Sequence, residues 1–325
     1  MNLLLKRLLA AVLWASLSWA GAAGQAQADT TDLGTSWLKI PLSARSAAMA
    51  GAFAAVADDA EAVQENPAGL ASMKQSQVTL MQSFWAQSVS VEDMAVGLPL
   101  SKNWGGAVMV DYLDFGQVDK VNIVNGAPVA AGNYSPSGLN FSAGIGGVVA
   151  DGLKLGGVAK FLYQDIQTTS SATLALDAGG LYRLVGTGLS FAAVVSNLGG
   201  TLDTDNLPLQ LTLGTALQTR LGGATYHAEP KAPALSLHYL TLSAQGDLTL
   251  YDTGFSNLRF GAEYWYRHEI AIRVGYRFAP YGDLSGVTGL ASGVGLRFGE
   301  WEFAYALTTQ GDMGTTSQVS LSNYF

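Results

Sequence analysis

The sequence predicts an all-β protein, a transmembrane antiparallel β-barrel of about 14 strands with a helical plug segment at its N-terminus. Three observations support this fold class. Of the 325 residues, 49% are hydrophobic and only 13% are charged, with 39 glycines and no cysteine. Beyond the N-terminal leader, no apolar run reaches the roughly 18 residues that a membrane-spanning helix needs. From about residue 76 onward, the chain alternates between apolar and polar residues, and closed barrels of such strands satisfy every backbone amide inside lipid.

The N-terminus has the features of a secretory signal. Lys6 and Arg7 precede an apolar run, and the small-residue sequence Ala-Gln-Ala ends at Ala28. This arrangement predicts a signal peptide that is cleaved after Ala28. A single N-terminal anchor helix is the alternative, but the run is short and polar residues follow the cleavage site. The predicted organisation is a signal peptide at 1–28, a plug segment at 29–75 and an outer-membrane β-barrel at 76–325.

The barrel strands are predicted from alternating apolar residues. In EIAIRVGYRF, the clearest example, Ile270, Ile272 and Val274 share one face, whereas Arg273 and Arg277 share the other. A soluble β-sandwich or propeller would also have short alternating strands, but its polar faces would carry more Lys and Glu than the Gly, Ala, Ser and Thr found here. Strands are expected at 77–87, 90–100, 104–114, 137–149, 153–165, 171–184, 188–197, 208–219, 235–244, 246–252, 256–267, 269–279, 290–299 and 301–325, with two strands in the last span.

The connections and the C-terminus also fit an outer-membrane barrel. Asp151-Gly152 and Gly186-Thr187 are expected to form tight turns at the periplasmic end. The sequence ends on Phe325 with alternating apolar residues before it, which resembles the terminal strand signature of such barrels. Long outer loops are expected at 115–136, 198–207 and 220–234.

Residues 44–63 are rich in alanine and are predicted to form a helix within the plug. Asn66-Pro67 is expected to end the helical part, because the residue before a proline is pushed out of the helical region. The acidic residues Asp58 and Asp59 would be costly against lipid, but they suit a polar lumen.

Charged strand residues are predicted to face the lumen. When the bulky apolar faces are assigned outward, nearly every strand charge lands inside, as expected because a charge at the lipid midplane costs roughly 2–4 kcal/mol. Five arginines on neighbouring late strands form what we call the Arg wall: Arg259, Arg267, Arg273, Arg277 and Arg297. The other predicted lumen charges are Asp111, Lys154, Lys160, Asp177, Arg183, Glu263 and Glu302.

The Arg wall allows three interpretations. It can hold the plug by pairing with Asp58 and Asp59. Its arginines can instead pair with other lumen charges and simply fill a small barrel. It can also bind the head group of an amphipathic anion, such as a fatty acid carboxylate, whose tail contacts apolar residues beyond it.

Catalytic chemistry has little support in the sequence. His227, His238 and His268 have no metal-binding spacing, and the chain lacks cysteine and a G-x-S-x-G motif. We therefore expect no enzymatic activity, no metal and no cofactor. The formal net charge of −8 argues against nucleic acid as a partner.

The segment 37–71, WLKIPLSARSAAMAGAFAAVADDAEAVQENPAGLA, combines a W-L-K-I opening, a small-Arg-x-x-x-Met-x-Gly-Ala-Phe centre, an Asp pair and an N-P-A-G-L end. It resembles the N-terminal motif of the PorV/PorQ family, a branch of the superfamily that includes the FadL-type long-chain fatty acid transporters. A later segment, LRFGAEYWYRHEIAIRVGY, is similar to a strand pair in the same family. The chain departs from the family at Ala50, where glycine is expected, and at Gln64-Glu65, which replace an aromatic residue. The plug residues that carry the resemblance are Arg45, Asp58, Asp59, Asn66, Pro67 and Gly69.

The resemblance implies a plugged barrel in the outer membrane of a Gram-negative-type bacterium. It implies a non-enzymatic protein that binds or transports a hydrophobic or amphipathic small molecule. The alternative is a PorV-like shuttle or scaffold for cargo in type IX protein secretion. The implied partners are outer-membrane lipid, a hydrophobic ligand and, for the alternative, components of the secretion system.

Overall fold

The protein is described by a computed structural model that covers residues 35, 37–85, 89–124, 126–221, 238–250, 255–278, 288–311 and 314–325. The expected signal peptide with its cleavage site, and the first residues of the expected plug, lie outside the described residues. None of the described helices is long and apolar enough to cross a membrane.

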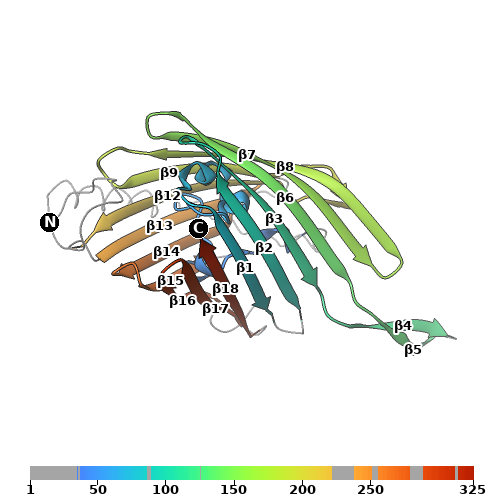
Figure 1. The fold of residues 1–325 in the computed structure, drawn as a ribbon. Coiled ribbons are helices and arrows are strands. Elements are labelled where there is room, and N and C mark those ends of the chain that lie inside the picture. Colours follow the sequence, from blue (N-terminus) through green and yellow to red (C-terminus); the bar gives the residue numbers. More distant parts are fainter. Residues whose placement is uncertain are drawn as a thin grey trace.

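Fourteen strands among the described residues form one closed antiparallel barrel, which confirms the predicted fold class (Figure 1). The first and last strands close it, with Gln77 opposite Tyr324 and Phe84 opposite Ser317. The barrel strands are β1 (Gln77–Phe84), β2 (Ser90–Pro99), β3 (Trp104–Asp114), β6 (Ser137–Ala150), β7 (Leu153–Ile166), β8 (Thr169–Arg183), β9 (Leu189–Gly199), β12 (Gln210–Arg220), β13 (His238–Thr249), β14 (Phe255–Tyr266), β15 (Ile270–Phe278), β16 (Thr288–Phe298), β17 (Trp301–Gln310) and β18 (Thr315–Tyr324).

Alternation along each strand separates an apolar exterior from a polar interior. In β15, Ile270, Ile272 and Val274 are exposed on the outside, whereas Ala271 and Arg273 are fully buried on the inside. A period of two residues places successive side chains on opposite faces of a sheet. The exterior therefore has the apolar surface that a lipid bilayer requires.

One predicted pair of strands proves to be a single strand. The expected spans 235–244 and 246–252 are joined in β13, which continues through Gln245, Gly246 and Asp247. The prediction placed a break at Gln245, but the strand runs through this residue, and Asp247 points into the lumen, where it pairs with Arg259 at 2.9 Å. The strand has only a register shift next to Asp247, so the prediction of a break was wrong.

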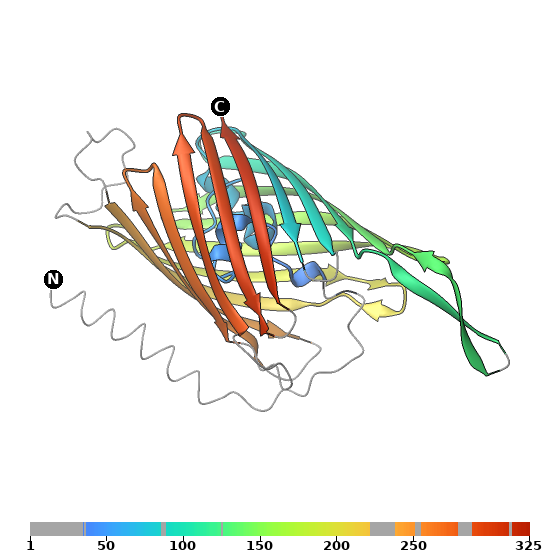
Figure 2. The ribbon, with the colours of Figure 1, turned by 90° about the horizontal axis from the view of Figure 1, so that it is seen from below.

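Two of the expected outer loops contain short sheets of their own. The stretch 115–136 holds β4 (Val118–Val124) and β5 (Ala127–Tyr134), a hairpin that projects beyond the barrel (Figures 1 and 2). The stretch 198–207 holds β10 (Thr201–Leu202) and β11 (Asp205–Asn206). Most of the third stretch, 220–234, lies outside the described residues. Strand β12, which leads into it, ends at the same end of the barrel as the Asp151-Gly152 turn, because the strands alternate in direction. The prediction that 220–234 is an outer loop at the end opposite to that turn was therefore wrong.

The plug lies inside the ring of strands (Figure 2). Its regular elements are α2 (Ala44–Ala48), α3 (Ala62–Glu65) and the 3₁₀ helix η2 (Pro67–Ser72). The prediction of one continuous helix over 44–63 is therefore wrong, although the α-helical part does end before Asn66, whose backbone is extended. The helix breaks at Ala50 and Gly51, where φ is 56° and 75°. At this point the plug backbone leaves the helix and runs along the barrel wall. The side-chain oxygen of Gln245 accepts hydrogen bonds from the N–H groups of Phe53 and Ala54, in place of the helical acceptors.

Glycines on the inner wall let the plug backbone approach the strands. A Cβ atom at Gly156 would lie 2.4 Å from the carbonyl carbon of Pro67, and one at Gly275 would lie 2.3 Å from that of Met49. No side chain fits at such distances, so these wall positions require glycine. Similarly close approaches to the plug occur at Gly97, Gly105, Gly144, Gly146, Gly179, Gly261 and Gly293. The plug is thus seated against strands on both sides of the barrel.

Candidate functional site

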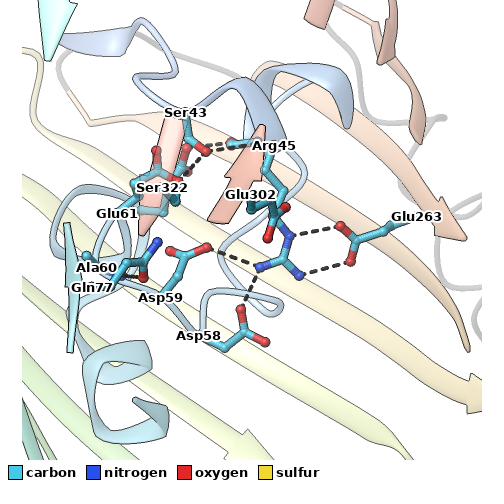
Figure 3. A network of polar contacts seen from close by, with 12 residues as sticks. Ser43, Arg45, Asp58, Asp59, Ala60, Glu61, Gln77, Glu263, Glu302 and Ser322 are labelled. Carbon is cyan, nitrogen blue, oxygen red and sulfur yellow. Dashed lines mark hydrogen bonds and ion pairs between the residues drawn. The ribbon is translucent and has the colours of Figure 1, made fainter. Parts of the chain in front are cut away.

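Arg45 of α2 is the centre of the polar contacts between plug and barrel (Figure 3). Its Nε and Nη2 atoms donate to the two carboxylate oxygens of Glu263 on β14, at 2.8 and 2.9 Å. Its Nη1 atom donates to Asp58 at 2.7 Å and to Asp59 at 3.1 Å. The guanidinium also stacks over the ring of Phe53, with 5.0 Å between the guanidinium carbon and the ring centroid. This two-pronged contact with Glu263 fixes both the position and the orientation of the plug.

The Arg wall pairs mainly with carboxylates of the barrel itself. Arg273 donates to Glu263 at 2.8 Å and to Glu302 at 3.2 Å. Arg297 donates to Glu302 at 2.5 Å, and its guanidinium lies between the rings of Trp265 and Tyr324. These contacts agree with the interpretation in which lumen charges neutralise one another.

Arg259 and Arg277 have partners other than Glu263 and Glu302, and Arg267 lies in a turn outside the barrel strands. Arg259 pairs with Asp247 and donates to the carbonyl oxygen of Gly51 at 3.3 Å, so it contacts the plug backbone. Arg277 donates to Gln310 at 3.1 Å. Arg267 does not belong to strand β14 as predicted. It lies in the turn between β14 and β15 with a φ of 53°, and its guanidinium stacks over Tyr266.

The predicted pairing of the Arg wall with Asp58 and Asp59 is therefore replaced by a different arrangement. Both aspartates bind Arg45, which belongs to the plug. Glu263 then joins Arg45 to Arg273 and so connects the plug to the wall. The reason is that Glu263 and Glu302 of the barrel already neutralise Arg273 and Arg297. These two arginines therefore do not need the plug aspartates as partners.

Asn66, Pro67 and Gly69 shape the end of the plug. The amide of Asn66 donates to the carbonyl oxygens of Ala54 and Gly180, and its oxygen caps η2 by accepting from the N–H of Ala68. Pro67 occupies the first turn of η2, where its missing N–H costs nothing. A Cβ atom at Gly69 would lie 2.5 Å from the carbonyl oxygen of Ala57, so this position requires glycine. The motif therefore serves the seating of the plug.

Burial raises the pKa values of several carboxyl groups of the plug. Burial raises the pKa of Asp59 from 3.8 to about 6, although Arg45 acts in the opposite direction. Burial also raises the pKa of Glu61 and that of Glu65. Each of the two glutamates accepts a hydrogen bond of 2.6 Å, Glu61 from Ser43 and Glu65 from Ser46.

The lumen wall opposite the charged strands carries an apolar cluster next to polar residues such as Asp111 and Lys160. Met109 and Leu113 on β3, Leu162 on β7 and Leu207 before β12 are buried in one cluster with Phe53 of the plug. In the ring of strands, β3, β6 and β7 lie across from β14, β15 and β16. The plug is thus held by ion pairs on one side, and on the other by apolar packing together with hydrogen bonds such as the one from Lys154 to Ser72.

A polar cavity with space for about 60 Å³ lies between residues 38–41, α3 and the barrel wall. Lys160 and Arg259 line it, but both are already bound, to Asp177 at 2.6 Å and to Asp247 at 2.9 Å. The cavity is large enough for a few water molecules or a small polar head group. Its other lining residues are Leu38, Lys39, Ile40, Pro41, Gln64, Glu65, Ser196, Asn197, Gln210, Thr212 and Gln245.

Some lumen residues were not found from the sequence. Gln245 was missed because the strand break was placed at it. Asp247 lies within the predicted span 246–252 but was not included among the predicted lumen charges. Asp93 was also missed, although it shares its strand face with the inward-facing Val91 and Ala95. Because Glu92 and Asp93 are adjacent in a strand, one of them had to face the lumen.

The histidines do not meet in one site within the described residues. The Nδ1 atom of His238 lies 2.5 Å from the hydroxyl of Tyr264, and His268 packs against the ring of Tyr239. His227 lies outside the described residues. In the described part of the chain, no group of three or more His, Asp or Glu side chains is arranged to hold a metal ion.

Comparisons with known proteins identify barrels of the same fold. The crystal structure of the Pseudomonas putida toluene transporter TodX matches with a TM-score of 0.54 and 11% identity, over 86% of this chain and 96% of TodX. The TodX monoaromatic hydrocarbon channel deltaS2 mutant matches with a TM-score of 0.54 and 12% identity, over the same shares of both chains. A search of curated proteins finds no match. The profile of the uncharacterised protein family UPF0164 matches residues 11–197, more than half of the sequence, and the chain therefore belongs to this family.

Proposed function

We propose that this protein is a non-enzymatic outer-membrane β-barrel that binds or transports a hydrophobic or amphipathic small molecule, in the manner of FadL-like proteins. The observation that carries the proposal is a cluster of apolar lumen side chains on β3 and β7, on the wall opposite the Arg wall, that includes Phe53 of the plug. The interior of a water-filled porin is polar throughout. An apolar cluster inside the lumen instead offers a binding surface for an apolar ligand.

The plug contacts indicate where a ligand would fit. On the charged side, the plug is fixed by Arg45 and Glu263 at 2.8 and 2.9 Å. On the other side, Leu162 and Met109 belong to the apolar cluster that includes Phe53 of the plug, and an apolar molecule can replace such packing without breaking an ion pair. The polar cavity beside α3 would receive a head group if the ligand has one.

The fold of TodX supports this proposal, because the TodX structures are described as those of a toluene transporter and a monoaromatic hydrocarbon channel. The apolar exterior of the barrel and the secretory signal predicted at 1–28 support an outer-membrane location. The plug motif around Arg45 and Asn66 supports the resemblance to the PorV/PorQ branch.

The experiment is a binding assay on native protein purified from outer membranes. Folding is first checked by heat modifiability, and co-purified small molecules are identified by mass spectrometry. Binding of a monoaromatic compound and of a fluorescent fatty acid is then compared between the parent, Leu162→Gln on the lumen face and Phe161→Ala on the outer face. We expect Leu162→Gln to weaken binding at least tenfold and Phe161→Ala to leave it unchanged. Equal binding by all three proteins, or no binding by any of them, contradicts the proposal.

The projecting hairpin favours a second candidate function, a PorV-like shuttle or scaffold for secreted cargo. Val121, Ile123 and Val129 in strands β4 and β5 are exposed to solvent. Exposed apolar strands of this kind are unusual unless they meet a partner. If the cargo scaffold is correct, deleting 118–134 should abolish co-purification of secreted proteins. If the small-molecule binding function is correct, the same deletion should leave small-molecule binding unchanged.

A further inference from the structure

The two barrel cations in the wall of the polar cavity beside α3 are already neutralised by carboxylates. The ammonium group of Lys160 lies 2.6 Å from Asp177 and donates to the amide oxygen of Asn197 at 3.1 Å. Arg259 pairs with Asp247 at 2.9 Å. The four charged side chains are no more than 6% exposed, so water screens these pairs only weakly. An anion that entered the cavity would therefore meet no uncompensated cation of the barrel.

The charges on the plug side of the cavity also offset each other. Lys39 and Glu65 both line it and contribute one positive and one negative charge. The described lining side chains and their ion-pair partners thus carry three cations and three carboxylates. A carboxylate ligand would add a fourth negative charge with no cation to match it, and burial of an unmatched charge is unfavourable.

The hydrogen-bond donors of the cavity wall bind one another, whereas acceptors are left over. The amide nitrogen of Gln210 donates to the hydroxyl of Thr212 at 3.0 Å, and this hydroxyl donates to Asp247 at 2.9 Å. The amide nitrogen of Gln245 donates to Asp247 at 3.1 Å. Among the described residues, no donor reaches the amide oxygen of Gln210 or the buried amide oxygen of Gln64.

The orientation of the Gln64 amide is fixed by the plug. Its nitrogen donates to the carbonyl oxygen of Ile40 at 3.3 Å, and a carbonyl oxygen can only accept. The amide oxygen is therefore the atom that needs a donor. A ligand hydroxyl can supply one, whereas an ionised carboxylate and a plain hydrocarbon have no hydrogen to donate.

The cavity adjoins the apolar cluster of the lumen. Leu38 and Ile40 line the cavity, and both pack against the cluster that contains Leu162 and Phe53. Lys160 in the cavity wall and Leu162 in the cluster lie two residues apart on the inner face of β7. A ligand whose apolar body lies in the cluster can place its polar end in the cavity, and the volume of about 60 Å³ limits that end to a few atoms.

We propose that this cavity binds the hydroxyl group of an uncharged amphipathic ligand, so that the barrel selects alcohols and phenols over fatty acid anions and plain hydrocarbons. The inference rests on the proposed function, because it assigns the polar end of the ligand whose apolar body lies in the lumen cluster. The hydroxyl donates to the amide oxygens of Gln64 and Gln210. Its own oxygen accepts from Lys160, whose ammonium group has three hydrogens and two partners among the described residues.

Binding of matched probes tests this proposal. Toluene, 4-methylphenol and 4-methylbenzoate share one apolar body and differ in the polar group, and 1-octanol and octanoate repeat the comparison with an aliphatic body. Dissociation constants are measured at neutral pH by calorimetry on the barrel in nanodiscs, with empty nanodiscs as the blank. We expect each hydroxyl compound to bind at least tenfold more tightly than its carboxylate, and 4-methylphenol to bind more tightly than toluene.

Variants of the cavity wall locate the effect. Gln64→Leu with Gln210→Leu should reduce the affinity for 4-methylphenol to that for toluene. The matched control makes the same changes at Gln82, on the outer face of β1, and at the exposed Gln117, and it should behave as the parent does.

A gain of binding provides a test that a misfolded variant cannot imitate. Asp177→Asn removes the charge that neutralises Lys160 but keeps an acceptor for the backbone N–H of Asn197, which lies at 2.7 Å. It should raise the affinity for 4-methylbenzoate at least tenfold. Asp151→Asn, the same change in an exposed turn, should not raise it.

Equal or tighter binding of the carboxylates by the parent overturns the proposal, as does an unchanged preference in the double Leu variant or no gain in Asp177→Asn. Leu162→Gln separates such a result from failure of the proposed function. If it weakens all probes while the parent binds them equally, the lumen function stands and the hydroxyl site falls. If the parent binds no probe, both fall.

Discussion

Replacing Arg45 by methionine removes the group that fastens the plug to the charged wall. The substitution deletes two hydrogen bonds to Glu263, at 2.8 and 2.9 Å, and contacts of 2.7 and 3.1 Å to Asp58 and Asp59. Methionine retains an apolar stem that can pack against Phe53. The effect therefore reports the lost charge and not a lost side chain.

The expected size of the effect follows from the burial of each partner. The side chain of Asp58 is 38% exposed and can be hydrated, and Glu263 retains Arg273 at 2.8 Å. Asp59, with 8% of its side chain exposed, loses its cation. Breaking a buried ion pair costs about 3–5 kcal/mol, and the lower end applies here because only one partner is orphaned. A cost of about 3 kcal/mol raises the population of released plug roughly 150-fold.

The assay is maleimide labelling of Val63→Cys, which places a thiol on the fully buried face of α3 in a chain that has no cysteine of its own. Labelling is measured at a fixed pH, with folding of the barrel confirmed by heat modifiability. Labelling should be on the order of 100-fold faster in Arg45→Met, because the rate follows the population of released plug. Arg45→Lys should give an intermediate rate, since it keeps the charge and loses the two-pronged geometry. Arg267→Met in the exposed turn is the matched control. An unchanged rate in Arg45→Met would refute the role of these ion pairs.

Three further predictions concern a glycine of the barrel wall, a carboxyl group of the plug and the turn between β14 and β15. Gly156→Val should prevent seating of the plug and lower the thermal midpoint of heat modifiability, whereas Gly180→Ala, whose Cβ meets only ordinary contacts, should not. Because burial raises the pKa of Asp59 from 3.8 to about 6, the stability it contributes is full below pH 4 and is lost as the pH rises through 6. Urea unfolding of Asp59→Asn should lack this pH dependence between 4 and 6. Replacing Arg267-His268, with φ of 53° and 54°, by Asn-Gly should raise stability in the same assay by about 0.5–1 kcal/mol, and a loss would contradict the turn geometry.

The sequence by itself determined the barrel and the faces of its strands. Alternation is a local property with a period of two residues, so it placed Arg273, Glu263 and Glu302 inside without knowledge of their neighbours. The plug motif likewise showed where the α-helical part ends, because the restriction on Asn66 comes from the adjacent Pro67.

Only the tertiary structure decided which charges meet. Arg45 and Glu263 are separated by 218 residues in sequence, and their contact depends on the register of every strand between them. The break in the predicted plug helix has the same origin, because the plug backbone follows the glycines of the wall instead of its own helical propensity. Local patterns fix the direction of each side chain, whereas closure of the barrel and seating of the plug fix its partner, and pairing in the lumen depends on both.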